Sequence, residues 1–268
     1  MTSPTSGSGA SRDDAQLRAP SLAAAAVELS SVVNALAVTS LTGGRTPGFR
    51  RLGVGAEQIE RNLATAVEPL THRSVWSIQP LMNFDPVDGS RTTNARSIER
   101  GLTLITITTE RTLRLNPLLS SEKPDVRVGP AQFQCIIADE ATAIVAGPLS
   151  EDGFPTAWLA TRSDVVDRVL SLWHETLARS RRAVPEGTSP PFTPRQCLVA
   201  RRLVVGTKDA AIARELGVSL RTVAADISHL VTQLGAPNRA AATLALRGGT
   251  QTSELSPCAP YLRSVREP

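Results

Sequence analysis

The 268-residue sequence contains few aromatic residues and few cysteines. Aromatic residues make up 3% of the chain, and its one tyrosine, Tyr261, lies near the C-terminus, so a ligand pocket walled by aromatic side chains is not expected. The three cysteines, Cys135, Cys197 and Cys258, are odd in number and lack the spacing of metal ligands. They indicate reduced thiols in an intracellular protein, and no metal site is predicted.

Sequence motifs for phosphate chemistry are also missing. The chain has no glycine-rich loop of the Walker type, which argues against an ATP-driven protein. A phosphorylated receiver domain needs clustered acidic residues at strand ends with a lysine nearby. The predicted strand at residues 102–108 is followed by Thr109 and Glu110, and Asp13 and Asp14 lie in a polar N-terminal segment. A phosphorelay input is therefore not expected, and no cofactor is predicted.

Long hydrophobic runs are limited to residues 21–41, which Glu28 and Asn34 interrupt. The segment is rich in serine and alanine and is only mildly apolar, which does not fit a membrane span or a signal peptide. We predict a soluble helix here, a candidate dimer contact, in a cytoplasmic protein without a membrane partner. The small, polar residues 1–20 are predicted to be a disordered tail.

Positive charge is concentrated towards the C-terminus. Residues 186–246 hold seven basic and four acidic side chains, a net of +3, whereas residues 1–185 hold nineteen of each. A neutral domain joined to a basic one is typical of a nucleic-acid-binding regulator. Lys123 and Lys208 are the only lysines among many arginines, and with the alanine and valine content this composition resembles that of proteins from GC-rich bacteria such as actinomycetes.

Residues 21–180 alternate between helical and strand patterns. This order predicts an α/β domain with a mostly parallel sheet, a hairpin and helices on both faces, followed by a proline-rich linker at residues 181–191. Strands are predicted at residues 75–79, 102–108, 125–129, 133–139 and 142–148, and helices at 21–41, 55–70, 94–101, 111–120 and 163–180.

The C-terminal pattern predicts an all-α domain of four helices at residues 192–247, with a tail at 248–268. Thr193 is a predicted N-cap, followed by Pro194 and, at the third helical position, Gln196, which together form a capping box. In the stretch "AAIARELGVSLRTVAADISHL", Gly217 follows one predicted helix and Ser219 is placed to cap the next. Apolar residues continue with helical spacing across this turn, so the two helices are predicted to share one core.

With "TPRQ", "DAAIARELGVSLRTV" and "QLGAPNRAAA" at these places, the segment resembles the LuxR/GerE-type helix-turn-helix domain of transcriptional regulators. The resemblance implies a helix at residues 220–234 in the DNA major groove and a fourth helix that pairs two protomers. Ala224 and Asp226 depart from it, because relatives usually carry Lys or Arg and His there. The candidate DNA-binding residues are Arg201, Arg202, Lys208, Arg214, Ser219, Arg221, Thr222, Ala225, Ser228, His229 and Arg239.

These candidates have different predicted roles. Arg221 has the reach and the forked donors for guanine, whereas Thr222 is expected to bond a phosphate at the positive end of the helix. Ala225 can offer a methyl contact to thymine. Asp226 is expected to repel phosphate or to accept from cytosine if it faces the groove. His229 is predicted to be a packing residue or a phosphate contact.

The order of elements in the α/β domain resembles, by pattern alone, the phospholipase D-like effector domains of TrmB-type regulators. Active phospholipase D enzymes carry H-x-K-x4-D, and neither His72, followed by Arg73 and Ser74, nor His174, within a predicted helix, matches it. No catalytic residue is therefore predicted. An acyl-homoserine-lactone sensor is also disfavoured, because aromatic residues are scarce.

Three hypotheses from different classes remain open. The leading one is a sequence-specific transcription regulator, not an enzyme, that binds double-stranded promoter DNA as a homodimer. Its α/β domain senses a small-molecule effector or contacts a protein such as RNA polymerase. The alternatives are an interaction module with weakened or lost DNA binding, and a phospholipase D-like hydrolase.

Overall fold

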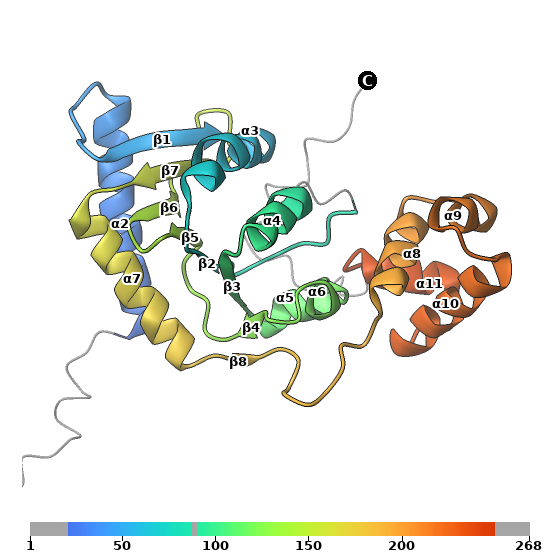
Figure 1. Cartoon of the computed structure of the whole chain (residues 1–268). Helices are drawn as coiled ribbons and strands as arrows, with labels where there is room; N and C mark the ends of the chain where they lie inside the picture. Colours follow the sequence, from blue (N-terminus) through green and yellow to red (C-terminus); the bar gives the residue numbers. More distant parts are fainter. Residues whose placement is uncertain (1–20, 87–89, 250–268) are drawn as a thin grey trace, which may run out of the picture.

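The computed structural model describes residues 21–86 and 90–249, so the predictions for residues 1–20 and for nearly all of the C-terminal tail fall outside it. Figure 1 shows an α/β domain and, at its right, a smaller helical domain. One sheet runs through the α/β domain in the order β1-β7-β6-β5-β2-β3-β4-β8. Its strands are β1 (Phe49–Val54), β2 (Ser74–Ile78), β3 (Thr103–Thr108), β4 (Arg127–Val128), β5 (Cys135–Ala138), β6 (Thr142–Ala146), β7 (Thr156–Ala160) and β8 (Arg181–Arg182).

The sheet is mixed, so the predicted mostly parallel sheet is wrong. Only β2–β3 and β3–β4 are parallel among the described strands, and β1–β7, β7–β6, β6–β5, β5–β2 and β4–β8 are antiparallel. The difference arises because the predicted β5–β6 hairpin continues into β7 and β1, which the sequence pattern did not indicate. The predicted turn of this hairpin is confirmed, with Asp139 and Glu140 at φ 52° and 60°. Three residues, 139–141, separate the paired Ala138 and Thr142, and the backbone N–H of Ala141 donates to the carbonyl of Ala138 to close the turn.

Two long helices, α2 (Leu22–Leu41) and α7 (Ser163–Ala178), cover one face of the sheet (Figure 1). Leu29, Val33 and Val169 pack there against the sheet around the buried Trp158 and Trp173. By length and composition α2 could cross a membrane, yet it packs on α7 and β1, and its Glu28 pairs with Arg168 on α7 at 2.6 Å. In this structure α2 is a helix of the α/β domain that packs on the sheet, and its predicted role as a dimer contact stays a prediction.

Shorter helices cover the opposite face, so the predicted covering of both faces is confirmed. They are α3 (Ala56–Asn62), the π-helix η1 (Leu63–Val67), the 3-10 helix η2 (Glu68–Leu70) and α4 (Ser90–Glu99). The short helices α5 (Glu110–Leu115) and α6 (Leu119–Glu122) follow β3, and α6 packs against the C-terminal domain. β8 pairs with β4, so the α/β domain extends to Arg182, into the segment predicted as a linker. A small core of Leu52, Val67 and Ile144 lies on this face.

The C-terminal domain has the four predicted helices, α8 (Pro194–Val204), α9 (Asp209–Leu216), α10 (Leu220–Gln233) and α11 (Arg239–Leu246). The capping box predicted at Thr193 and Gln196 is present. Gly217 ends α9 at φ 65°, a conformation that favours glycine, and Ser219 caps α10. The buried core is Val199, Ala200, Ile212, Val223, Leu230 and Leu246.

Candidate nucleic-acid interface

The exposed face of α10 is the face that the sequence predicts to meet DNA. Val223, Ile227 and Leu230 are buried against α8 and α9, which turns the intervening positions outwards. Because the side chains repeat every three to four residues, the exposed residues form one continuous strip along the helix. That strip consists of Arg221, Ala224, Ala225, Ser228 and Thr232.

The N-terminal turn of α10 is fixed by its own side chains. The Ser219 hydroxyl accepts a hydrogen bond from the Thr222 backbone N–H at 3.1 Å, and the two hydroxyl oxygens lie 2.9 Å apart. Ser219 is exposed and Thr222 is half-buried. Since the cap occupies only one lone pair of Ser219, both hydroxyls keep capacity to bond a phosphate at the positive end of the helix.

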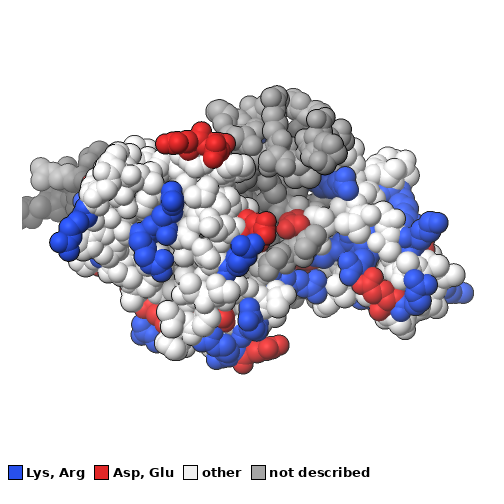
Figure 2. All heavy atoms as spheres, turned by 90° about the horizontal axis from the view of Figure 1, so that it is seen from above, with Lys and Arg blue, Asp and Glu red and all other residues white. Residues whose placement is uncertain are grey.

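Most arginines of the C-terminal domain are held in ion pairs. Arg202 donates from Nε to Glu215 at 2.8 Å, and Arg239 donates to Asp209 at 2.6 Å. Lys208, Arg214 and Arg221 are exposed and have no hydrogen-bond or ion-pair partner among the described residues. Figure 2 shows the Lys and Arg side chains gathered over this end of the molecule with acidic side chains between them. The free positive charge of the candidate interface therefore comes from the start and body of α9 and from the first turn of α10.

Arg201 does not belong to this surface, which corrects its prediction as a phosphate contact. Its side chain is 7% exposed and points into the α/β domain, where Nε and Nη2 donate to the two carboxylate oxygens of Glu122 at 2.6 and 2.7 Å. Nη1 donates to the carbonyls of Asp85 and Pro86, and the guanidinium lies 5.2 Å from the centroid of the Phe84 ring. Arg201 is an interdomain residue in this conformation.

Asp226 is also turned away from the exposed strip, so neither of its predicted groove contacts is available. Its side chain is 3% exposed, and Arg195 at the start of α8 donates to its two oxygens at 2.7 and 3.2 Å. The sequence carried a signal for this placement. Val223, Asp226, Ile227 and Leu230 repeat with the spacing of a buried helix face, so Asp226 joins the core side of α10.

His229 has a packing contact, which was one of its two predicted roles. Its Nε2 lies 3.4 Å from the carbonyl oxygen of Pro191, and its ring meets the Phe192 ring edge-on at 6.3 Å between centroids. His229 therefore ties α10 to the segment that enters the C-terminal domain. The backbone N–H of Phe192 in turn donates to Ser121 of the α/β domain at 3.1 Å.

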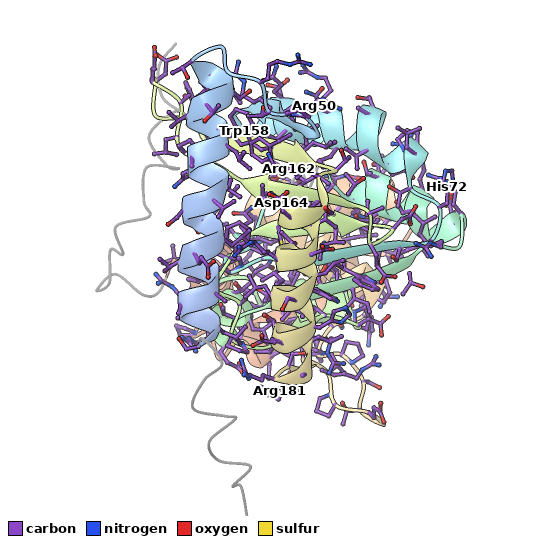
Figure 3. All side chains as sticks on the ribbon, turned by 90° about the vertical axis from the view of Figure 1, so that its left-hand side faces the viewer. Arg50, His72, Trp158, Arg162, Asp164 and Arg181 are labelled. Carbon is purple, nitrogen blue, oxygen red and sulfur yellow. The ribbon has the colours of Figure 1, made fainter. Side chains whose placement is uncertain are left out.

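The α/β domain brings none of its histidines into a metal cluster. Among the described residues no group of three or more His, Cys, Asp and Glu side chains could hold a metal ion. His72 lies two residues before β2, away from α2 and α7 (Figure 3), and is exposed. Its backbone N–H donates to the Asp139 carboxylate at 2.7 Å, which holds the start of β2 against the β5–β6 turn. His174 is exposed on α7, with its ring edge-on to Trp76.

The Asp139 carboxylate holds the start of β2. Beside His72, the backbone N–H groups of Arg73 and Ser74 donate to it at 2.7 and 2.9 Å. Burial raises the pKa of Asp139, but these three hydrogen bonds and the charge of Arg73 outweigh it, so its pKa is lowered overall. This is the behaviour of a carboxylate that stays ionised to accept backbone donors.

Both described cysteines are free and buried. Burial raises the pKa of Cys135 to about 12. Burial and the nearby Glu122 carboxylate raise the pKa of Cys197 to about 12, while the positive charges of Arg201 and Arg91 oppose the rise. Both groups are neutral thiols at physiological pH, which excludes them as nucleophiles in this state.

The helix-turn-helix geometry agrees with comparison to known proteins. Residues 190–246 match the model of the family described as bacterial regulatory proteins, luxR family. This segment is therefore a LuxR-type domain, and it supports a role in DNA-binding transcription regulation. The chain matches no curated protein.

Several solved structures are similar to parts of the chain. Nuc, a phospholipase D family member from Salmonella typhimurium, is 12% identical over 51% of this chain and 98% of its own, with a TM-score of 0.41. TrmBL2, an archaeal chromatin protein, is 11% identical over 64% of this chain and 66% of its own, with a TM-score of 0.37. The Vibrio cholera VqmA-ligand-DNA complex is 18% identical over 44% of this chain and 51% of its own, with a TM-score of 0.22.

Proposed function

We propose that this chain is a cytoplasmic, bacterial transcription regulator that binds promoter DNA as a homodimer, with α10 in the major groove. The observation that carries the proposal is the exposed strip of α10 next to three unpaired cations, within a segment that matches the LuxR family. The α/β domain serves as the input part of the regulator. It senses a small molecule or contacts a protein such as RNA polymerase, and it does not catalyse a reaction.

The residues divide into two roles. Lys208 and Arg214 bind phosphates, since they are exposed cations with no other partner among the described residues. Ser219 and Thr222 bond the same backbone through their hydroxyls. Arg221 reads a base, helped by the methyl contacts of Ala225 and the hydroxyl of Ser228 along the exposed strip. Arg202 and Arg239 contribute less, because each already pairs with a carboxylate.

Salt dependence tests the electrostatic part of the proposal. If each protomer neutralises three phosphates, the log of the binding constant falls with the log of salt concentration with a slope of about −3 per protomer. Fluorescence anisotropy of a labelled promoter duplex from next to the gene, titrated at several salt concentrations, measures this slope. A flat response favours the alternative of an interaction module that has lost DNA binding.

A pair of variants tests base reading. Arg221→Ala is expected to weaken binding to the preferred site by roughly 1–3 kcal/mol and to relax the preference at one position of each half-site. Arg214→Ala is the matched comparison, because it also removes one exposed arginine but should weaken all sequences alike. If both variants lose affinity equally on preferred and on random DNA, Arg221 contacts the backbone and base reading lies elsewhere.

A further inference from the structure

A cavity of about 780 Å³ lies between the α/β domain and the C-terminal domain. The sheet forms one wall, α3 and α4 line its sides, and α8 contributes Pro194, Cys197 and Leu198 at one end. Pockets for drug-sized molecules span roughly 300–1,000 Å³, so this cavity is large enough for a small-molecule ligand.

The wall formed by the sheet is largely apolar. Four strands line the cavity with apolar side chains, those of Val75, Leu104, Ile136 and Ile144. Leu63 of the helix η1 lines it as well. When an apolar molecule displaces water from an apolar wall, the free energy of the complex falls roughly in proportion to the area covered. The bulk of a ligand for this cavity is therefore apolar.

A few neutral polar groups interrupt the apolar wall. Ser77 donates a hydrogen bond to Thr106 at 3.0 Å, and the Thr106 hydroxyl proton has no acceptor among the described residues. The amide side chains of Gln79, Asn94 and Gln134 line the cavity and have no hydrogen-bond partner in the described part of the chain. Such groups orient a ligand and supply hydrogen bonds to an acceptor on it.

Two basic side chains line the cavity, those of Lys123 and Arg91, and Lys123 has an interaction of its own. Arg91 of α4 forms no hydrogen bond or ion pair with the described residues. Cys197 of α8 lines the same cavity, so Arg91 and the C-terminal domain border one shared space. Glu122 also lines the cavity, but both of its oxygens are held by Arg201. An anionic group on the ligand is therefore favoured at this end.

The same end of the cavity carries the contact between the domains. Cys197 lies one helical turn before Arg201 on α8, and Glu122 lines the cavity while it pairs with Arg201. A ligand that touches α8 and Glu122 consequently touches both sides of the interface. A ligand changes the affinity of a second site only if it binds two arrangements of the protein with different affinities. A ligand that contacts both sides of this interface meets that condition when the interface rearranges.

We propose that this cavity binds a mainly apolar small molecule with one anionic group, such as a medium-length carboxylic acid, and that its binding changes DNA affinity through the docking of α8 on α6. The proposal rests on the proposed function only for its second half, since ligand binding itself does not require DNA. The two halves are tested by separate measurements on the full-length protein.

Binding is measured with anilinonaphthalene sulfonate, an apolar dye with a single anionic group. Ala95 lies on the cavity-lining side of α4 and is exposed, so Ala95→Trp fills space without disturbing the core. Thr92→Trp adds the same side chain to the same helix away from the cavity and is the matched control. We expect Ala95→Trp to weaken dye binding about tenfold and Thr92→Trp to keep it within about twofold of wild type. Equal binding by both variants would place the dye elsewhere and overturn the proposed site.

The anionic preference is measured by displacing the dye with decanoate or with the uncharged decanol. Decanoate should displace it at concentrations about tenfold lower than decanol in the wild-type protein. Arg91→Ala should abolish this difference, and Arg96→Ala, which removes an exposed arginine of α4 outside the cavity, should keep it. Equal potency of the two molecules on the wild type would show that Arg91 does not select an anion.

Coupling is measured as the anisotropy of a labelled duplex with and without saturating decanoate. The DNA dissociation constant of the wild type and of Thr92→Trp should shift by about fivefold or more, and that of Ala95→Trp should not. An unchanged constant in the wild type overturns the coupling. If the protein binds no DNA under any condition while dye binding is intact, the proposed function is overturned. The cavity is then a ligand site that does not regulate DNA binding.

Discussion

The two adjacent arginines of α8 make a direct test of the domain interface. Arg201 and Arg202 each pair with one glutamate, but the pair of Arg201 is buried, with 7% and 17% of the side chains exposed, whereas the pair of Arg202 has 44% and 44% exposed. Removing one partner of a buried ion pair typically costs about 3–5 kcal/mol, because the other charge is left uncompensated. An exposed pair contributes about 0–1 kcal/mol.

Arg201→Ala should therefore lower the free energy of unfolding by about 3 kcal/mol, at the lower end of the range because water can reach part of Glu122. The carbonyls of Asp85 and Pro86 lose a donor in the same variant. Arg202→Ala should cost less than about 1 kcal/mol. Urea denaturation followed by far-ultraviolet circular dichroism measures both values on the same footing.

A double-mutant cycle separates the ion pair from the rest of the contact. When Glu122→Gln is combined with Arg201→Ala, the losses should be less than additive, because the two side chains share one interaction. Additive losses, or equal losses for Arg201→Ala and Arg202→Ala, would refute the reasoning from burial. Arg201→Ala should also leave the salt slope of DNA binding unchanged, since the guanidinium faces the α/β domain and not the phosphates.

Three further outcomes are expected. Asp226→Ala should lower the free energy of unfolding in urea, because a buried carboxylate that accepts two hydrogen bonds from Arg195 is lost; an unchanged free energy of unfolding would contradict the structural role of Asp226. The lowered pKa of Asp139 stabilises the fold above about pH 4, and this stabilisation is lost as pH falls through the folded pKa, so the stability difference between wild type and Asp139→Asn should shrink on acidification; a difference that grows would be inconsistent. The purified protein should not hydrolyse bis(p-nitrophenyl) phosphate, and turnover that disappears in His72→Ala would instead support the hydrolase alternative.

The C-terminal domain could be predicted closely because its signals are local. The capping box at Thr193, the positive φ at Gly217 and the cap at Ser219 each involve residues no more than four positions apart. Apolar spacing then assigns the buried and exposed faces of each helix without knowledge of any distant contact. Arg221, Ala225 and Ser228, which the sequence predicts as DNA contacts, lie on the exposed strip of α10.

The sheet was harder to predict because strand pairing is not local. β1 pairs with β7 more than a hundred residues away, and its sequence "FRRLGV" carries two arginines that hide the alternation of a half-buried strand. β7 follows a turn at residues 151–153, and its five residues, "TAWLA", are too few to show a clear alternation. Both strands join the hairpin side of the sheet, which is why the proportion of antiparallel pairs was underestimated.

The partners of the arginines could not be predicted from the sequence either. Arg201 meets Glu122 across 79 positions, and Arg195 meets Asp226 across 31, so spacing along the chain carries no information about either pair. Charge counting treats both arginines as available to DNA. Only the packing of α8 against α6 and α10 shows that they are not.

The pairing also changes the meaning of the net charge of +3 for residues 186–246. Of the seven basic residues there, Arg195, Arg201, Arg202 and Arg239 are paired, and seven minus four leaves Lys208, Arg214 and Arg221. The number agrees with the formal net charge, but one of the neutralising carboxylates, Glu122, belongs to the α/β domain. All of the free charge lies between the start of α9 and the start of α10, beside the exposed strip, whereas the formal count would spread it over the domain. Electrostatic attraction to phosphate should therefore be greatest at the first turn of α10, the part of the helix that the proposed function places against DNA, and Arg201 should not contribute to it while it is paired with Glu122.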